Sequence, residues 1–342
     1  MAATVAAVVK QQRRGCCSVK RLFLTIVLFS AVPIAFIISI ERSLSSSSNV
    51  YLYNSNGYLR ESAVWDAANS RFLVSFFDNG IGQISVRDDD DASHLQEMVV
   101  VKDKDLAGYA SLGLAIDRPR NRLLVAIADV LTNRYSALAA YDLSDWNRLF
   151  LTRLADSGDE KSMADDVAVD PEGNAYVTDA KSSKIWKVGV NGELQSIIRS
   201  PLFTPKEWYK SLIALNGIVY HPDGYLLVIH TLSGNLFKII LNQDDGGHEV
   251  KLVKIVSGSV VMGDGIELFS PTKLVVAGNP SGRLVESSDG WETASVVSKF
   301  FGPMHRVATA AVVKDGKVYL SHLLGMGYPK MKHALVEAVF SI

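Results

Sequence analysis

Most of the chain after about residue 50 consists of short apolar runs of strand length that are separated by tight turns. Residues 165–179, "DDVAVDPEGNAYVTD", form one such pair of strands around a Pro-x-Gly turn, and "NGIVYHPDGYLLVIH" at 216–230 aligns with them without a gap. The same outline occurs in "ESAVWDAANSRFLVSF" (61–76), "LGLAIDRPRNRLLVAIAD" (112–129), "DGIELFSPTKLVVAG" (264–278) and "ATAAVVKDGKVYLSH" (308–322). The chain therefore repeats one strand–turn–strand unit six times.

The spacing of these units predicts the fold. They begin at residues 61, 112, 165, 216, 264 and 308, which are 44–53 residues apart. This length suits four strands per unit, a strong inner hairpin followed by two weaker outer strands such as "SKIWKVG" and "NLFKIIL". We predict an all-β, six-bladed β-propeller over residues 50–342, in which "VYLY" at 50–53 adds a strand to the last blade and closes the ring.

The N-terminus follows a different pattern. Residues 22–40 are uncharged and long enough to cross a bilayer as a helix. Basic residues in the preceding tail (1–21) predict a cytosolic N-terminus and a single-pass type II orientation, with the propeller in the secretory-pathway lumen, the vacuole or the extracellular space. The length favours an uncleaved signal anchor over a signal peptide. Residues 41–49 are predicted to be a Ser-rich tether, and Cys16 and Cys17 are either palmitoylated or unmodified thiols.

Composition restricts the classes of molecule that the protein is expected to bind. A net charge of −1 gives no electrostatic footprint for nucleic acid. A hydrophobic content of 48% is that of a folded protein with a sizeable core, and no cysteine after Cys17 is available for a disulfide. We expect a monomer that acts on or binds a small molecule.

The first position of each inner strand carries the candidate chemistry. In order along the chain these positions are Glu61, Leu112, Asp165, Asn216, Asp264 and Ala308. Inner strands of a propeller surround its channel, so oxygen-bearing side chains at this register would converge, and three ionised carboxylates would repel one another strongly. A hard cation resolves the conflict, and Ca²⁺ suits carboxylate and amide oxygens best, although another divalent cation is possible. The alternative is that Asp and Asn stand there because they favour turns.

Neighbouring residues have secondary roles in this scheme. Asp166 is expected to point the other way along the strand and to orient its surroundings. His230 and His322 end returning strands at the same rim and are candidates for proton transfer or for rim hydrogen bonding. Trp65, Trp186 and Trp208 are interpreted as blade packing or rim contacts.

Four motifs resemble one known family. "ESAVWD", "ADDVAVDPEG", "NGIVYHPDG" and "GDGIEL" are similar to the metal-site motifs of the senescence-marker-protein/gluconolactonase family, the calcium-dependent phosphotriesterase-like six-bladed propellers. The resemblance spans roughly residues 50–342 and implies metal ligands at Glu61, Asp165, Asn216 and Asp264. Two departures are Asp165-Asp166 where the family usually has Asn-Asp, and the lack of the Gly-Pro that commonly follows the glutamate.

The resemblance implies a metal-dependent hydrolase of a lactone, ester or phosphoester. In such an enzyme Asp264 would attack the substrate or activate water, and His322 or His230 would move protons. Two other functions are compatible with the blade pattern. One is a lyase or condensing enzyme resembling strictosidine synthase, and the other is a non-catalytic scaffold whose calcium only joins the blades.

Overall fold

The computed structural model describes residues 20–22, 25–29, 31–43, 50–86, 94–155, 158, 160–241 and 247–341. Cys16, Cys17 and residues 44–49 of the predicted tether lie outside these residues, and residues 41–43, predicted as tether, belong to the N-terminal helix. The chain divides into two compact units, Met1–Ser48 and Asn49–Ile342. In the first, a helix over Lys20–Ser43 is long and apolar enough to cross a membrane, a property that signal sequences share.

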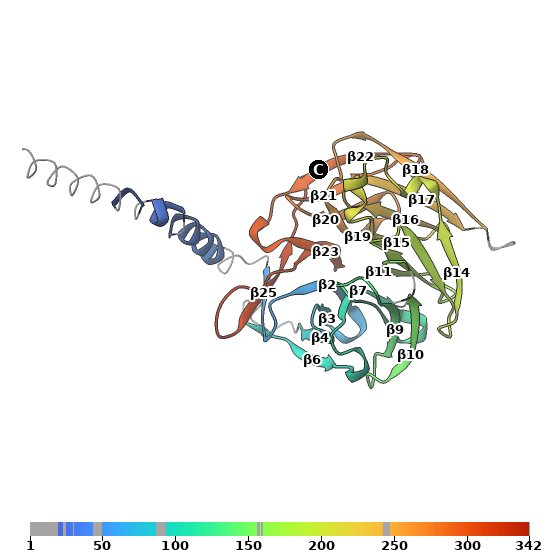
Figure 1. Ribbon diagram of the computed structural model, residues 1–342, viewed down its shortest axis with the longest axis horizontal. Coiled ribbons are helices and arrows are strands. Elements are labelled where there is room, and N and C mark those ends of the chain that lie inside the picture. The colour runs from blue at the N-terminus through green and yellow to red at the C-terminus, as the bar shows by residue number, and fades with distance from the viewer. Residues whose placement is uncertain are drawn as a thin grey trace, which may run out of the picture. The chain divides into compact units, whose positions relative to one another are not determined.

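The second unit is almost entirely antiparallel sheet (Figure 1). Its first three four-stranded blocks are β2 (Arg60–Asp66), β3 (Arg71–Phe76), β4 (Ile81–Ser85) and β6 (Met98–Val101); β7 (Ala110–Asp117), β8 (Arg122–Ala128), β9 (Ser136–Asp142) and β10 (Arg148–Ala155); and β11 (Ala164–Val169), β12 (Ala175–Asp179), β13 (Lys184–Val188) and β14 (Leu194–Arg199).

The next three blocks repeat this order. They are β15 (Leu215–His221), β16 (Tyr225–His230), β17 (Asn235–Leu241) and β18 (His248–Ser257); β19 (Gly263–Ser270), β20 (Lys273–Gly278), β21 (Gly282–Glu286) and β22 (Thr293–Phe300); and β23 (Ala308–Lys314), β24 (Lys317–His322), β25 (Met331–Glu337) and β1 (Val50–Ser55). The short β5 (Leu95–Gln96) pairs with β1. Parallel pairing of β18 with β22 joins the fourth and fifth blocks into one eight-stranded sheet. Single 3₁₀ turns lie in the connections: η1 (Ala67–Asn69), η2 (Lys104–Leu106), η3 (Arg118–Arg120), η4 (Pro201–Phe203), η5 (Trp208–Leu212) and η6 (Met304–Arg306).

The first strands of the six blocks form a closed ring. Strands β2, β7, β11, β15, β19 and β23 each contact the next, and β23 returns to β2, so that all six surround one axis in Figure 1. Strand β1 completes the last block by pairing with β25 from Val50↔Val336 to Ser55↔Met331, which confirms the predicted closure by residues 50–53. The architecture is a propeller-like fold with six blades.

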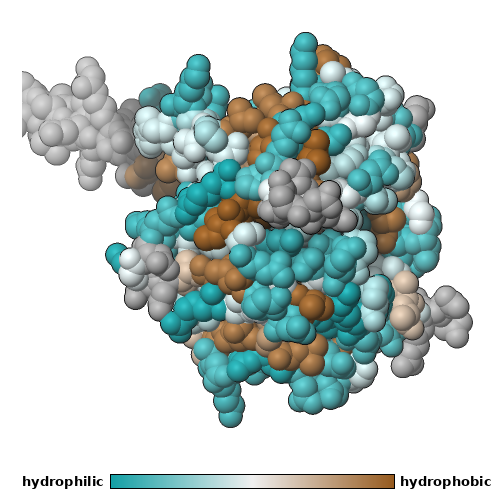
Figure 2. Space-filling view, turned by 90° about the vertical axis from the view of Figure 1, so that its right-hand side faces the viewer, coloured by the Kyte–Doolittle hydropathy of each residue, from teal (hydrophilic) through white to brown (hydrophobic). Residues whose placement is uncertain are grey.

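Apolar side chains fill the space between successive blades. Leu73 of the first blade packs with Leu123 and Val125 of the second, and Leu124 packs with Val177 and Trp186 of the third. The predicted packing role of Trp186 is confirmed, because it is fully buried. Figure 2 shows the outer side of the disc as a hydrophilic surface broken by apolar patches. Burial between blades, rather than any disulfide, holds the described part of the ring together.

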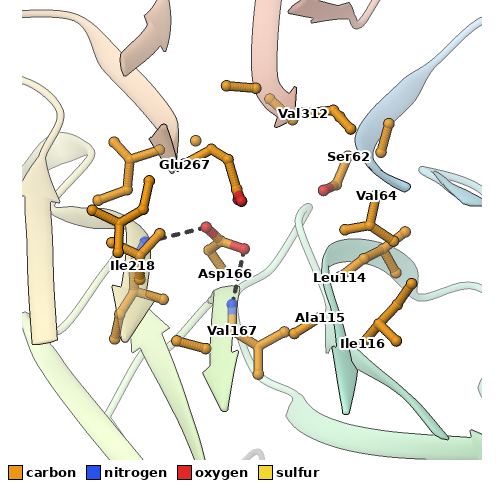
Figure 3. Close-up of a pocket in the computed structure, with 18 of the residues that line it drawn as sticks. Ser62, Val64, Leu114, Ala115, Ile116, Asp166, Val167, Ile218, Glu267 and Val312 are labelled. Atoms are coloured by element: carbon orange, nitrogen blue, oxygen red, sulfur yellow. Dashed lines mark hydrogen bonds between the residues drawn. The ribbon is translucent and has the colours of Figure 1, made fainter. Parts of the chain in front are cut away.

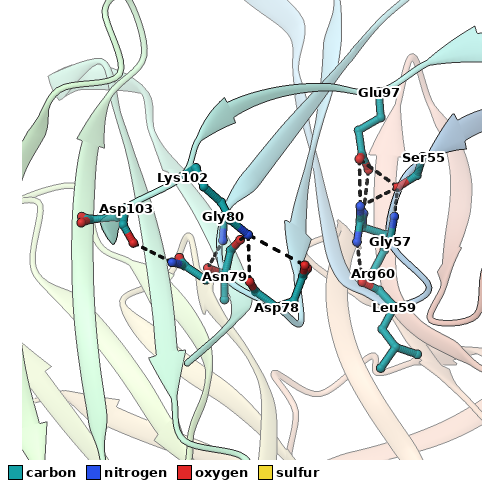
Figure 4. A network of polar contacts seen from close by, with 11 residues as sticks. Ser55, Gly57, Leu59, Arg60, Asp78, Asn79, Gly80, Glu97, Lys102 and Asp103 are labelled. Carbon is teal, nitrogen blue, oxygen red and sulfur yellow. Dashed lines mark hydrogen bonds and ion pairs between the residues drawn. The ribbon is translucent and has the colours of Figure 1, made fainter. Parts of the chain in front are cut away.

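Polar contacts reinforce the place where the ring closes (Figure 4). Arg60, the first residue of β2, pairs with Glu97, with Arg60 Nε 2.6 Å from Glu97 Oε2. The Arg60 guanidinium also donates to Ser55 Oγ at the end of β1 and lies 3.8 Å from the centre of the Phe76 ring. One buried cation therefore joins the last strand of the sixth blade to the first strand of the first.

Each inner strand begins with one extra residue relative to its partner strand. In β11, for example, Ala164 pairs with Asp179 and Val167 pairs with Val177, so three steps on the inner strand match two on β12. Register shifts of this kind occur in all six inner strands. Such a β-bulge changes the side to which the following side chains point.

The bulges also correct the alignment of the sixth unit. Counting back from the regular pairs Ala63↔Val74 and Ala311↔Leu320 places Thr309, not Ala308, at the register of Glu61. The equivalent positions are therefore Glu61, Leu112, Asp165, Asn216, Asp264 and Thr309. Five of these six residues carry an oxygen atom in the side chain.

Candidate metal centre

The three acidic members of this register interact through space; Asp165 is buried, and Glu61 and Asp264 are partly exposed. Asp165 and Asn216 are 7% and 6% exposed. Burial raises the pKa of Glu61 well above its usual range, and the charges of Asp165 and Asp264 raise it further. Burial followed by the charge of Asp264 does the same to the pKa of Asp165. The structure thus brings the three predicted carboxylates within electrostatic reach of one another at one end of the channel.

Asp264 and Asn216 interact directly with each other. Burial raises the pKa of Asp264 to about 7, while a hydrogen bond from the Asn216 side chain acts in the opposite direction. On Glu61 and Asp165, the atoms Oε2 and Oδ2 are buried and have no hydrogen-bond partner. Buried carboxylate oxygens without a partner are costly unless they are protonated or contact a cation.

The carboxylate and amide oxygens of these residues are ligands that a hard cation prefers. Their positions, however, do not form a complete coordination site. Within the described ranges, no three His, Cys, Asp or Glu side chains stand in an arrangement that could hold a metal ion as it is. The unpartnered oxygens and the mutual electrostatic effects support a cation, whereas its coordination remains a prediction.

Asp166 departs from the sequence-based expectation. Instead of pointing away from the channel, it lines the channel cavity, because the β-bulge between Ala164 and Val167 alters the alternation of side chains. Its Oδ1 accepts from Val167 N at 2.9 Å and its Oδ2 from Ile218 N at 3.2 Å (Figure 3). Burial raises the pKa of Asp166 to about 7.

Glu267 is a channel residue that the sequence reasoning missed. In Figure 3 its carboxylate points toward that of Asp166. Burial, and then the charge of Asp166, raise the pKa of Glu267 to about 8. The equivalent residues of the other blades are all apolar: Val64, Ala115, Ala168, Val219 and Val312. A charged residue at this one position of "DGIELF" was the signal that could have identified it.

The cavity between the inner strands has a volume of about 350 Å³. It extends from Glu61 and Asn216 at one end to Trp65 and Arg118 toward the other. Glycines bring the strands close together near the carboxylates. A Cβ on Gly217 would lie 2.5 Å from the Asp264 backbone oxygen, and one on Gly113 would lie 2.5 Å from Asp166 Cα. Side chains at these two positions would push the blades apart.

The two candidate histidines are placed differently from the carboxylates. His230 and His322 end β16 and β24 on the predicted rim, but they are 0% and 2% exposed and do not line the channel cavity. Burial lowers the pKa of each to about 4, so both are neutral at pH 7. His322 Nδ1 lies 3.3 Å from Ala334 O, whereas His230 Nε2 has no hydrogen-bond partner. A role in proton transfer stays a prediction for both.

Comparisons with known proteins support the fold. No family model matches the chain, and no curated protein matches its sequence. Among solved structures, the major allergen Mala s 1 of Malassezia sympodialis is similar with a TM-score of 0.66 and 14% identity, covering 86% of this chain and 97% of the allergen. A putative gluconolactonase has a TM-score of 0.55 and 15% identity, covering 86% of this chain and 94% of that protein.

A gluconolactonase from Xanthomonas campestris is also similar, with a TM-score of 0.52 and 13% identity over 83% of this chain and 88% of that one. At this identity the likeness extends to the fold alone. The chain therefore has a propeller-like fold that gluconolactonases share.

Proposed function

We propose that the protein is a Ca²⁺-dependent hydrolase of a lactone, ester or phosphoester. The observation that carries this proposal is the cluster of acidic side chains at one end of the channel. The charges of Asp165 and Asp264 raise the pKa of Glu61, and the charge of Asp264 raises the pKa of Asp165. Glu61 and Asp165 each have a buried oxygen atom without a hydrogen-bond partner. The likeness to gluconolactonase structures supports a hydrolase fold and leaves the substrate open.

Glu61, Asp165, Asn216 and Asp264 are the residues that would hold the ion. Oxygen ligands and a net negative charge favour Ca²⁺ over softer metals, although another divalent cation could bind. When bound, the ion would polarise a carbonyl or phosphoryl oxygen of the substrate.

The chain's own residues would handle the proton and the nucleophile. Asn216 orients the Asp264 carboxylate through its side-chain hydrogen bond. Asp264 would then attack the substrate or accept a proton from water. His230 and His322 are the proposed proton carriers; the Nε2 atom of His230 is buried and has no hydrogen-bond partner.

A non-catalytic scaffold is the second candidate. Its specific support is that Glu61, Asp165, Asn216 and Asp264 lie on the inner strands of four different blades, so that one ion held by them would join those blades. A calcium ion that only joins the blades would need no open coordination position. No comparable observation favours the lyase alternative.

We further propose that the Lys20–Ser43 helix is a signal anchor. The basic residues before it would keep the N-terminus cytosolic, which places the propeller in the lumen, the vacuole or outside the cell. The propeller would act there as a monomer on a small molecule.

Metal analysis of the purified full-length protein tests the central proposal. We expect about one Ca²⁺ per chain after dialysis against calcium, and turnover in a panel of lactones, aryl esters and phosphotriesters that stops when a chelator is added. Bound calcium without turnover of any panel member would favour the scaffold. Absence of bound metal would refute both the hydrolase and the calcium scaffold.

A further inference from the structure

Exposed apolar side chains gather at one end of the propeller. The connections that lead into the inner strands, and those that follow the second strand of each blade, lie at the end where Glu61 and Asp264 stand, because the strands alternate in direction. Their exposed large apolar residues are Tyr58, Leu131, Leu202, Trp208, Tyr209, Leu212, Ile213, Val261, Met262, Phe301, Met304 and Tyr328. In the described connections at the opposite end, the corresponding set is Val339 alone.

Several of these side chains are close in sequence to the residues of the proposed site. Met262 is two residues before Asp264 and 41% exposed, and Ile213 is three residues before Asn216 and 38% exposed. Trp208, which is 77% exposed, begins the 3₁₀ turn η5 that leads into the same strand as Asn216. The apolar surface formed by Trp208, Tyr209, Leu212, Ile213 and Met262 is called the apolar rim below.

Backbone hydrogen bonds join these segments around the axis. Ala214 N donates to Ala180 O at 2.9 Å, Thr231 N donates to Ala214 O at 3.0 Å, and Met262 N donates to Thr231 O at 2.8 Å. These main-chain contacts hold Met262, and Ala214 next to Ile213, beside the starts of the inner strands β15 and β19. Apolar groups fixed in water next to a buried polar site are characteristic of ligand recognition, in which a few polar groups orient a mainly apolar ligand.

We propose that the substrate carries a long apolar chain, such as the acyl or alkyl chain of a medium- or long-chain ester or lactone, and that the apolar rim binds this chain. The inference rests on the proposed hydrolase function and names its substrate class. A polar sugar lactone would leave these side chains exposed to water, whereas an alkyl chain would cover them while its ester group lies at the carboxylates.

A membrane surface is the competing occupant of the apolar rim. The position favours the substrate, because Met262 and Ile213 stand two and three residues before Asp264 and Asn216, the residues proposed to act at the ester group.

The test compares 4-nitrophenyl acetate, butanoate and octanoate with the full-length protein in lipid nanodiscs containing calcium. We expect kcat/KM to rise about threefold for each added methylene that the rim covers, and therefore at least tenfold from acetate to octanoate. Trp208→Ser and Ile213→Ser should lower the octanoate value several-fold more than the acetate value. Leu252→Ser on outer strand β18, where Leu252 is 50% exposed, is the matched control and should not alter the ratio.

A binding measurement separates the proposed hydrolase function from the proposed recognition of an apolar chain. The non-hydrolysable ketone 2-dodecanone should blue-shift tryptophan emission of the wild type, and the shift should be lost in Trp208→Phe. Absence of turnover for every ester would refute the hydrolase, and ketone binding would then still support apolar recognition. Turnover without a chain-length preference, failure of the ketone to bind, or protection of Trp208 from acrylamide by nanodisc lipid rather than by ketone would each overturn the inference.

Discussion

Arg60 and Glu97 form an ion pair that is almost completely buried, with both side chains 3% exposed and Arg60 Nε 2.6 Å from Glu97 Oε2. Arg60 starts the first inner strand, and Glu97 follows the short strand that extends the last blade. The pair therefore links the last blade to the first blade at the point where the ring closes.

Glu97→Gln should destabilise the protein by about 3 kcal/mol, because it leaves the Arg60 guanidinium buried with an uncompensated charge. Urea unfolding of the propeller measures this. The matched control is the exposed pair Lys102–Asp78 in Figure 4, whose side chains are 56% and 72% exposed. Asp78→Asn should change stability by less than about 0.5 kcal/mol. Equal effects of the two substitutions would contradict a special role for the closure.

Without calcium, the propeller should become less stable as the pH rises from about 5 to 8. Burial raises the pKa of Asp264 and Asp166 to about 7 and that of Glu267 to about 8, so the folded state binds more protons than the unfolded state in this window. Stability then falls with increasing pH, by an amount on the order of a few kcal/mol. Chelated protein unfolded in urea at pH 5 and pH 8 gives the comparison.

Added calcium should reverse most of that loss at pH 8. An ion that binds only the folded state at one hundred times its Kd stabilises by about 2.7 kcal/mol. A pH-independent urea midpoint in the chelated protein would show that the channel carboxylates remain ionised without a bound cation. That result would argue against a need for calcium at this site.

Glu267→Gln should raise the stability of the calcium-free protein at pH 8 by about 1–3 kcal/mol, because it removes a charge from an otherwise apolar ring of the channel beside Asp166. The substitution should have little effect at pH 5, where Glu267 is already protonated. Glu286→Gln serves as the control, since the Glu286 side chain is 40% exposed. Destabilisation by Glu267→Gln at pH 8 would instead indicate that this carboxylate makes a required contact.

Asp264→Asn and Glu61→Gln distinguish a catalytic from a structural metal site. Each removes one charge with nearly the same shape, so both should weaken calcium binding and lower the thermal midpoint. If Asp264 performs the chemistry, its variant should lose at least a hundredfold in kcat even at saturating calcium, whereas Glu61→Gln should recover with added calcium. Activities that fall only in proportion to lost metal would support the scaffold.

Protease protection tests the membrane orientation. In sealed microsomes the propeller, residues 49–342 of the compact unit, should resist digestion until detergent is added, because the basic residues before the Lys20–Ser43 helix keep the N-terminus on the cytosolic side. Digestion without detergent would reverse the proposed topology. Loss of the N-terminal segment from the mature protein would identify it as a signal peptide.

The sequence by itself determined the repeat and therefore the fold. Strand-length apolar runs around Pro-x-Gly and related turns, 44–53 residues apart, can bury their apolar faces only against neighbouring copies. It also identified Glu61, Asp165, Asn216 and Asp264 as equivalent positions, because equal distances from the hairpin turn place residues at the same level of the channel.

Only the tertiary structure decided which neighbouring side chains enter the channel. A two-residue alternation assumes an unbroken ladder, and the extra residue at the start of each inner strand breaks it, so Asp166 faces the cavity and Thr309 replaces Ala308 in the register. The burial of His230 and His322, the approach of Glu267 to Asp166 and the hydrogen bond from Met262 N to Thr231 O depend on contacts between different blades or connections. Those contacts are set by packing across the ring, which no local pattern specifies.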